Sequence, residues 1–120
     1  MTLRCVIVDD NPEFLRTAQE LLEGEGVMVV GTAAGADDAL RLMREFGPDV
    51  ILIDIDLGSE SGFELARLIE AKGEPHTPSI LVSAYQESDY RTLIETSPAI
   101  GFMSKADLSA SRILELMASR

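Results

Sequence analysis

The sequence has a single cysteine and no long apolar run. Cys5 cannot form a disulfide within the chain, and its apolar neighbours indicate a small buried side chain in a reducing compartment. No segment approaches the roughly 18 consecutive apolar residues that a membrane-spanning helix needs, and no apolar signal region follows the N-terminus. We therefore expect a cytoplasmic protein without a membrane partner.

Basic residues are also few: there are 10 against 21 acidic ones, and the net charge is −11. A field of this sign repels the phosphates of nucleic acids and the surfaces of anionic membranes. Direct nucleic-acid binding by this chain is therefore not expected, whereas a metal cation or a basic patch on a partner suits it. The only histidine, His76, is expected in a surface loop and not at a catalytic site.

What the sequence does have is an alternation of two hydrophobic patterns. Short apolar runs, typical of strands buried on both faces, alternate with segments whose apolar residues recur at helical spacing. The predicted strands cover residues 3–8, 27–30, 49–54, 80–82 and 99–103. The predicted helices cover residues 12–24, 36–46, 63–72 and 86–96, and a C-terminal segment capped by Asp107 or Ser109.

Five strand–helix units predict an α/β fold of the flavodoxin-like, doubly wound kind, in one domain over residues 1–120. Right-handed crossovers restrict the topology of its five-stranded parallel sheet. The strand order 2-1-3-4-5 fits, with five helices on the two faces and a crevice at the carboxyl ends of strands 1 and 3. Gly31 is expected to end the second strand, and residues 58–62 are expected to form a polar loop.

Polar side chains stand at the carboxyl ends of four of these strands. Asp9 and Asp10 follow the first, Asp54 ends the third, Ser83 follows the fourth and Lys105 follows the fifth. Alone, each residue has a local interpretation as a helix cap, a turn residue or a surface charge. Because these four strands are neighbours in the predicted order, we expect the five side chains to share one pocket.

Clustered carboxylates repel one another unless a cation lies between them. Mg²⁺ prefers oxygen ligands and is commonly held by one or two carboxylates, waters and phosphate. Asp54 could then act as a nucleophile on phosphorus, with Lys105 balancing the charge of the phosphoryl oxygens and Ser83 donating a hydrogen bond to one of them. The cluster therefore predicts phosphoryl transfer to Asp54, with Mg²⁺ as cofactor.

The chain resembles the receiver domain of two-component response regulators over essentially its whole length. The resemblance implies that Asp54 accepts a phosphoryl group from a histidine kinase. It also implies that Asp9, Asp10 and Asp54 hold Mg²⁺, together with the backbone carbonyl of Asp56. The matching segments are Val8-Asp9-Asp10-Asn11, Leu52-Ile53-Asp54-Ile55-Asp56-Leu57, Ser61-Gly62-Phe63-Glu64, Val82-Ser83-Ala84 and Gly101-Phe102-Met103-Ser104-Lys105.

The same resemblance implies a switch made of Ser83 and Phe102. In such domains the hydroxyl moves toward the phosphoryl group and the aromatic ring turns inward. The movement alters the face made by helix 4, strand 5 and helix 5, which is a candidate surface for a homodimer. Physically, a local charge event biases a packing element that has two states.

Two positions depart from the family pattern. Ala106 replaces the usual proline after Lys105, and without proline a cis peptide there would cost about 2.5–4 kcal/mol. Residues 105–108 are instead similar to receivers that precede a LuxR/NarL-like helix-turn-helix output domain. Gly58 stands where many receivers have proline and is expected to loosen the loop after Asp54.

Two side chains near the predicted pocket are expected to tune the lifetime of the acyl phosphate. Tyr85 lies two residues beyond Ser83, and the side chain of Asp56 is left free if only its carbonyl binds the metal. Either group could shield the acyl phosphate or place a water molecule near it.

Three other interpretations stay open. Asp54-Ile55-Asp56 resembles the paired acids of haloacid dehalogenase-type phosphatases, but those usually follow the first strand and not the third. A toprim-type nucleic-acid module also places acids at strand ends, but the net charge of −11 argues against it. The third is a receiver fold used only as an interaction module, without phosphorylation. We expect a phosphoacceptor domain and not an enzyme acting on a separate substrate.

Overall fold

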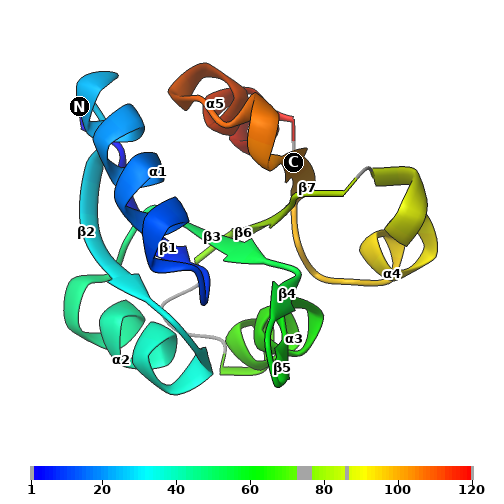
Figure 1. The fold of residues 1–120 in the computed structure, drawn as a ribbon. Coiled ribbons are helices and arrows are strands. Elements are labelled where there is room, and N and C mark those ends of the chain that lie inside the picture. The colour runs from blue at the N-terminus through cyan, green and yellow to red at the C-terminus, as the bar shows by residue number, and fades with distance from the viewer. Residues whose placement is uncertain (1, 73–76, 86, 120) are drawn as a thin grey trace.

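In the computed structural model, residues 2–72, 77–85 and 87–119 are described. Within them, a central parallel sheet is flanked by helices on both faces (Figure 1). The sheet comprises β1 (Arg4–Val8), β2 (Met28–Ala33), β3 (Val50–Asp54), β6 (Ser79–Ser83) and β7 (Gly101–Ser104). The α-helices are α1 (Pro12–Gly24), α2 (Ala36–Phe46), α3 (Gly62–Lys72), α4 (Arg91–Glu95) and α5 (Ala110–Ala118). The short elements are β4 (Asp56–Leu57), β5 (Glu60–Ser61) and the 3₁₀ helices η1 (Glu87–Tyr90) and η2 (Lys105–Asp107).

The strands of the main sheet lie in the order β2-β1-β3-β6-β7, and all neighbours are parallel. Counting only these strands, this is the predicted order 2-1-3-4-5, so the doubly wound fold is confirmed. β4 and β5 form a separate antiparallel pair.

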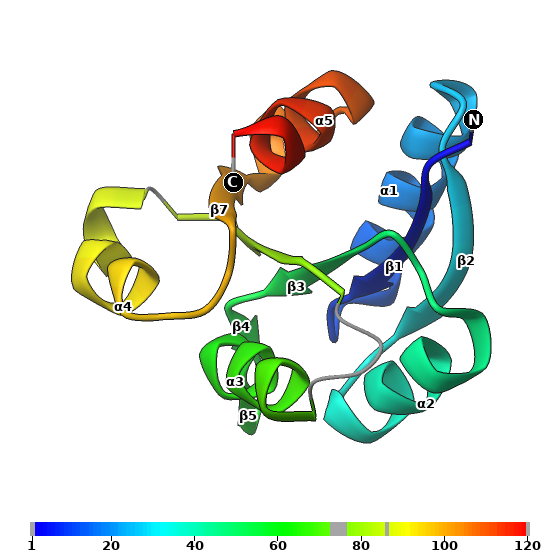
Figure 2. The ribbon, with the colours of Figure 1, turned by 180° about the vertical axis from the view of Figure 1, so that it is seen from behind.

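Two hydrophobic clusters lie on opposite faces of the sheet, because successive strand residues point to opposite sides. Val6 and Ile51 belong to the cluster under α2 and α3, to which residues of η1 and α4 add. Ile7 and Leu52 belong to the cluster under α1 and α5. Figures 1 and 2 show this division of the helices between the two faces.

The first helix begins as its sequence predicts. The side chain of Asn11 accepts hydrogen bonds from the backbone N–H groups of Glu13 and Phe14, and Pro12 occupies the first turn. At the last helix the cap is Ser109, whose side chain accepts from the N–H of Arg112, while Asp107 belongs to η2.

The second strand is longer than predicted, because Gly31 lies inside it and does not end it. A Cβ atom at Gly31 would lie 2.8 Å from Cδ2 of Leu42 on α2. The glycine therefore allows the helix to pack closely against the strand, a role that a breaker pattern does not distinguish from a turn.

The expected polar loop over residues 58–62 was also wrong in part, because the chain folds there into the β4–β5 hairpin. Leu57 pairs with Glu60, which leaves a two-residue turn. Gly58 takes φ +73° in that turn, a conformation suited to two-residue hairpin loops and closed to proline. The loop after Asp54, which Gly58 was expected to loosen, is thus a defined turn.

The remaining differences concern α4 and the surface. The predicted helix over 86–96 is a 3₁₀ turn followed by the five-residue α4. The helical spacing of Leu21, Phe46 and Leu68 predicts that these side chains lie on inner helix faces, but the structure leaves them exposed. His76 and Gln86 lie outside the described residues. Over the described ranges, no helix is both long enough and apolar enough to span a membrane.

Candidate functional site

The parallel register brings the predicted site residues to one edge of the sheet. Val8 of β1 is level with Ile53, so Asp9 and Asp54 leave neighbouring strands side by side. Ser83 of β6 is level with Ser104, which places Lys105 one residue further along. Asp9, Asp54, Ser83 and Lys105 line one open cavity of about 220 Å³. The predicted convergence is therefore found in the structure.

Asp9 is the most deeply buried acid of the site, with no exposed surface. Its Oδ1 accepts a hydrogen bond from the backbone N–H of Asn11 at 2.9 Å. Its Oδ2 lies 2.7 Å from Nζ of Lys105 but has no well-aligned hydrogen bond from any described residue. A buried carboxylate oxygen without a well-aligned hydrogen bond is suited to a further cationic partner.

Asp54 ends β3 with its carboxylate turned into the cavity, and only 8% of the residue is exposed. Oδ1 accepts a hydrogen bond from the N–H of Asp56 at 3.3 Å, and Oδ2 lies 3.6 Å from Nζ of Lys105. Burial, followed by the charge of Asp9, raises the pKa of Asp54 to about 6, although Lys105 and the Asp56 N–H act in the opposite direction.

Lys105 is the cation of the site, and its side chain is 21% exposed. Burial by itself lowers the pKa of the ammonium group, but its contacts with Asp9 and Asp54 outweigh that effect and the net pKa is raised. Lys105 is therefore charged at neutral pH, and it faces the carboxylate of Asp54.

The three predicted acidic ligands are arranged to hold a metal ion. Asp9, Asp10 and Asp54 each offer a carboxylate oxygen, and these oxygens lie within 4.8 Å of one another. Asp10 is exposed, and a Cβ atom at Gly58 would lie 3.0 Å from its Oδ2. Hard oxygen donors, mutual repulsion and the poorly satisfied Oδ2 of Asp9 fit a divalent cation such as Mg²⁺.

Asp56 lies on the rim of the same cavity. Its side chain is exposed and accepts a hydrogen bond from the N–H of Gly58 at 3.1 Å. The side chain is thus used in the hairpin turn. The role of its backbone carbonyl as a metal ligand stays a prediction.

The structure places the two members of the predicted switch in different surroundings. Ser83 is buried at the cavity, and its Oγ accepts a hydrogen bond from the N–H of Tyr85 at 3.0 Å. Phe102 does not line the cavity and is buried in the cluster under α2 and α3.

Tyr85 is 60% exposed at the cavity mouth, and its ring meets Tyr90 edge-on at 6.4 Å.

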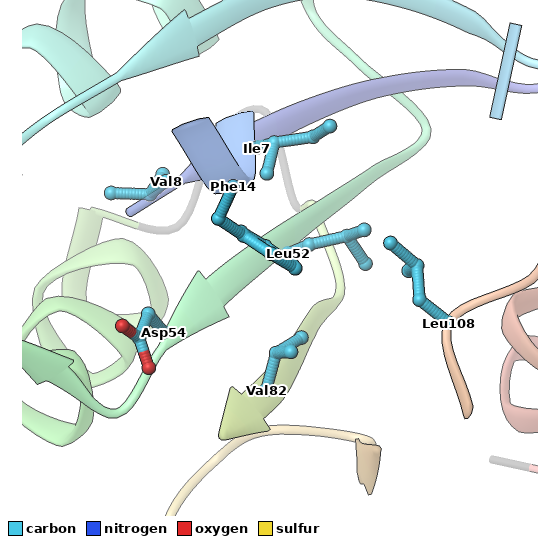
Figure 3. A pocket seen from close by; sticks show the side chains of 7 residues that line it. All are labelled: Ile7, Val8, Phe14, Leu52, Asp54, Val82 and Leu108. Atoms are coloured by element: carbon cyan, nitrogen blue, oxygen red, sulfur yellow. The ribbon is translucent and has the colours of Figure 1, made fainter. Parts of the chain in front are cut away.

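A narrow apolar gap lies beneath the site, between α1 and the sheet (Figure 3). Phe14 reaches from α1 toward Leu52, and Val82 and Leu108 line the gap from the other side. Asp54 stands at its polar end. The helical spacing of Phe14 with Ala18 and Leu22 predicts only a place on the apolar stripe of α1, and it holds no signal that the ring also reaches the site.

The fold and the site together define a doubly wound α/β domain with a polar cavity at the carboxyl ends of its strands, suited to a divalent cation and an anion. The chain belongs to the response regulator receiver domain family, whose sequence profile matches residues 5–117. Among curated relatives, the polar-differentiation response regulator DivK of Brucella ovis is 32% identical over 120 residues, covering 99% of this chain and 96% of DivK. The response regulator GacA of Pseudomonas aeruginosa is 31% identical over 105 residues, covering 86% of this chain and 48% of GacA.

Solved structures agree with this assignment. The receiver domain of the response regulator NarL from Mycobacterium tuberculosis superposes with a TM-score of 0.85 at 27% identity, covering 99% of this chain and 98% of that one. A LuxR-family two-component response regulator from Aurantimonas sp. superposes with a TM-score of 0.87 at 29% identity, covering 100% and 88%. The chain thus spans about half the length of GacA but nearly all of DivK.

Proposed function

We propose that this domain accepts a phosphoryl group on Asp54 from the phosphohistidine of a histidine kinase. The supporting observation is the position of the Asp54 carboxylate, beside Lys105 at 3.6 Å and within a group of three acids. This arrangement supplies a nucleophile, a counter-charge for phosphoryl oxygens and oxygen ligands for a cation. Membership of the receiver family supports the same proposal.

In the proposed reaction a carboxylate oxygen of Asp54 attacks the phosphorus of the donor in line with its leaving group. The new P–O bond forms as the P–N bond of phosphohistidine breaks, and the imidazole nitrogen keeps the electron pair and later takes a proton. Lys105 pairs with a phosphoryl oxygen. To do so, its ammonium group gives up part of its contact with Asp9 and Asp54. Ser83 donates a hydrogen bond from its hydroxyl group to another phosphoryl oxygen after its Oγ leaves the Tyr85 N–H.

Asp9, Asp10 and Asp54 would hold Mg²⁺, which when bound neutralises charge on the phosphoryl group. Asp10 is exposed and Asp9 is fully buried, so the cation would enter from the cavity mouth. The backbone carbonyl of Asp56 is the further ligand that we propose from the family resemblance.

The output of the domain is proposed from its relatives and its surface. Ser83 and Phe102 would relay phosphorylation to the face made by α4, β7 and α5, where a homodimer could form. Two similar proteins are a response regulator named NarL and a LuxR-family response regulator, which supports a role in transcription regulation through a separate output domain. We also propose that the protein is cytoplasmic, that this chain binds neither nucleic acid nor membranes directly, and that it does not act as an enzyme.

Two alternative functions are less well supported. A haloacid dehalogenase-type phosphohydrolase would place its paired acids after the first strand, whereas Asp54 and Asp56 follow the third. A receiver fold serving only as an interaction module has no need for the buried Asp9 and Asp54 beside Lys105, because burying acids without a use costs stability.

The test is incubation of the chain with Mg²⁺ and acetyl phosphate, followed by intact mass measurement. We expect the addition of one phosphoryl group, which requires Mg²⁺ and is removed by hydroxylamine. Asp54→Asn should not gain the mass, whereas Asp56→Asn should. A mass shift that persists in Asp54→Asn would overturn the assignment. Turnover of p-nitrophenyl phosphate by the wild type would favour the phosphohydrolase.

A further inference from the structure

The ammonium group of Lys105 lies over an aromatic ring as well as beside two carboxylates. Its Nζ is 4.2 Å from the centroid of the Phe14 ring. The same atom is 2.7 Å from Oδ2 of Asp9 and 3.6 Å from Oδ2 of Asp54. A cation this close to the centre of a ring face is attracted by the ring quadrupole, which gives Lys105 a third partner.

The surroundings of the ring fix its position. Phe14 is half-buried, and on the side of the sheet it borders the apolar gap with Leu52, Val82 and Leu108 (Figure 3). That gap is too narrow to hold a water molecule. The backbone N–H of Phe14 is bound by the side chain of Asn11, two residues from Asp9, so the ring is anchored to the same turn as the acidic site.

The contact further restricts a side chain that the two ion pairs hold only at its charged end. A lysine has four rotatable bonds, and holding them in one arrangement costs conformational entropy. The two acids attract the ammonium group without fixing its direction, because a point charge has no preferred angle. The ring adds a surface beneath it and leaves the side facing Asp54 open.

We propose that Phe14 is a positioning residue for phosphoryl transfer, which holds the Lys105 ammonium group at the place where the phosphoryl oxygens of Asp54 form. This inference rests on the proposed phosphorylation of Asp54 and deepens it. Preorganised charge aimed at the reacting group accelerates such reactions, because less reorganisation is needed during the step. Phe14 does not touch the reacting atoms and acts through Lys105.

The kinetic test compares the rate of phosphorylation by acetyl phosphate with Mg²⁺ in the wild type, Phe14→Leu and Phe14→Tyr. We expect Phe14→Leu to be slower by roughly 2- to 30-fold, the range that cation–π contacts span. Phe14→Tyr keeps an aromatic face and should restore most of the rate. Phe46→Leu, at the exposed end of α2, is the matched control and should leave the rate unchanged.

A double-variant cycle shows whether Phe14 acts through Lys105. In a Lys105→Ala background, Phe14→Leu should have no further effect on the rate. An equal slowing in both backgrounds would overturn the proposal, because the ring would then act through general packing. If the wild type gains no phosphoryl group at all, the proposed function fails. If the wild type reacts and Phe14→Leu reacts equally fast, only this inference fails.

A spectroscopic test of the contact can be read from the wild-type chain alone, and two variants then check its cause. The ε-methylene protons of Lys105 should show an upfield ring-current shift in the NMR spectrum of the wild-type chain. The shift should be lost in Phe14→Leu and kept in Phe14→Tyr. Ordinary lysine shifts for Lys105 in the wild-type spectrum would contradict the contact directly.

Discussion

The carboxylate of Glu60, on the β4–β5 hairpin, accepts a hydrogen bond from the backbone N–H of Ala36 at the start of α2, at 2.8 Å. The residue at the N-cap of α2 is Gly35, which has no side chain to make a cap. Glu60 takes that role from 24 residues away. The hairpin that follows the proposed phosphoacceptor is thereby tied to a helix on one face of the sheet.

Removing this tie should weaken α2. Glu60→Ala removes the side-chain acceptor of the Ala36 N–H, and caps of this kind contribute about 0.5–1 kcal/mol at an exposed position. We expect a loss of that size in the free energy of unfolding, measured by urea denaturation. Glu20→Ala, on the exposed face of α1, is the control and should change little.

A local cap should replace the distant one. Gly35 has φ −156°, an extended conformation that serine also adopts, and Glu60→Ala clears the space that a Cβ atom there would share with the Glu60 carboxylate. Gly35→Ser in the Glu60→Ala background should therefore recover most of the lost stability. If it does not, the loss does not arise from the helix end.

Gly62 should not tolerate a side chain. A Cβ atom there would overlap the backbone carbonyl oxygen of Asp54 and lie 2.9 Å from Cα of Ile55. Because backbone atoms cannot turn aside as a flexible side chain can, we expect Gly62→Ala to lower the free energy of unfolding by about 3 kcal/mol. It should also slow phosphorylation, since the overlap displaces Asp54 itself.

The control for Gly62 is Gly24 at the end of α1, where a Cβ atom would meet nothing within 4 Å. Gly24→Ala should raise the stability by about 0.5 kcal/mol, because alanine has less freedom to lose on folding. Both variants are measured by thermal and urea unfolding. Equal effects at the two glycines would contradict the close approach at Asp54.

Asp54 should make the metal-free protein less stable as the pH rises. Its pKa is about 6 in the folded chain against an ordinary value of 3.8, so between these pH values the folded state binds more protons than the unfolded state. Stability therefore falls as pH rises through this window and levels off above it. Asp54→Asn removes the effect and should be more stable than the wild type at pH 7, by about 2 kcal/mol.

The measurement is a series of thermal unfolding curves in EDTA between pH 4 and 8. The advantage of Asp54→Asn should shrink toward pH 4, where the carboxyl group is protonated in the folded state and already partly protonated in the unfolded state. Adding Mg²⁺ at pH 7 should stabilise the wild type more than the variant, since a ligand that binds only the folded state adds stability. An advantage that does not change with pH would refute the raised pKa as its cause.

Tyr85 should prolong the life of the acyl phosphate. Its ring stands at the cavity mouth, where we expect it to limit the approach of water to a phosphoryl group on Asp54. Tyr85→Ala should therefore increase the rate of phosphate loss severalfold, measured as the decay of the phosphorylated mass after removal of the donor. Tyr85→Phe keeps the ring and should decay like the wild type. An unchanged rate in Tyr85→Ala would end this role for Tyr85.

Much of the site could be predicted because its residues follow strands that the sequence marks clearly. Asp9, Asp54, Ser83 and Lys105 each stand where an apolar run ends, and parallel strands in a known order bring such ends together. The β4–β5 hairpin could not be predicted in the same way. Its strands have two residues each, which is too short for any period to show, and the polar composition suited a loop equally well.

The sequence by itself determined the order of strands and helices along the chain, because that order follows from local periodicity. It also determined which acids stand at the carboxyl ends of the strands, because each of them follows the end of an apolar run. Only the tertiary structure decided that Phe14 lies under Lys105, that Glu60 caps α2 and that Gly31 lies within a strand. These contacts join residues far apart in the chain. Their geometry depends on how closely helices pack on the sheet, and side-chain packing of that kind leaves no periodic trace in the sequence.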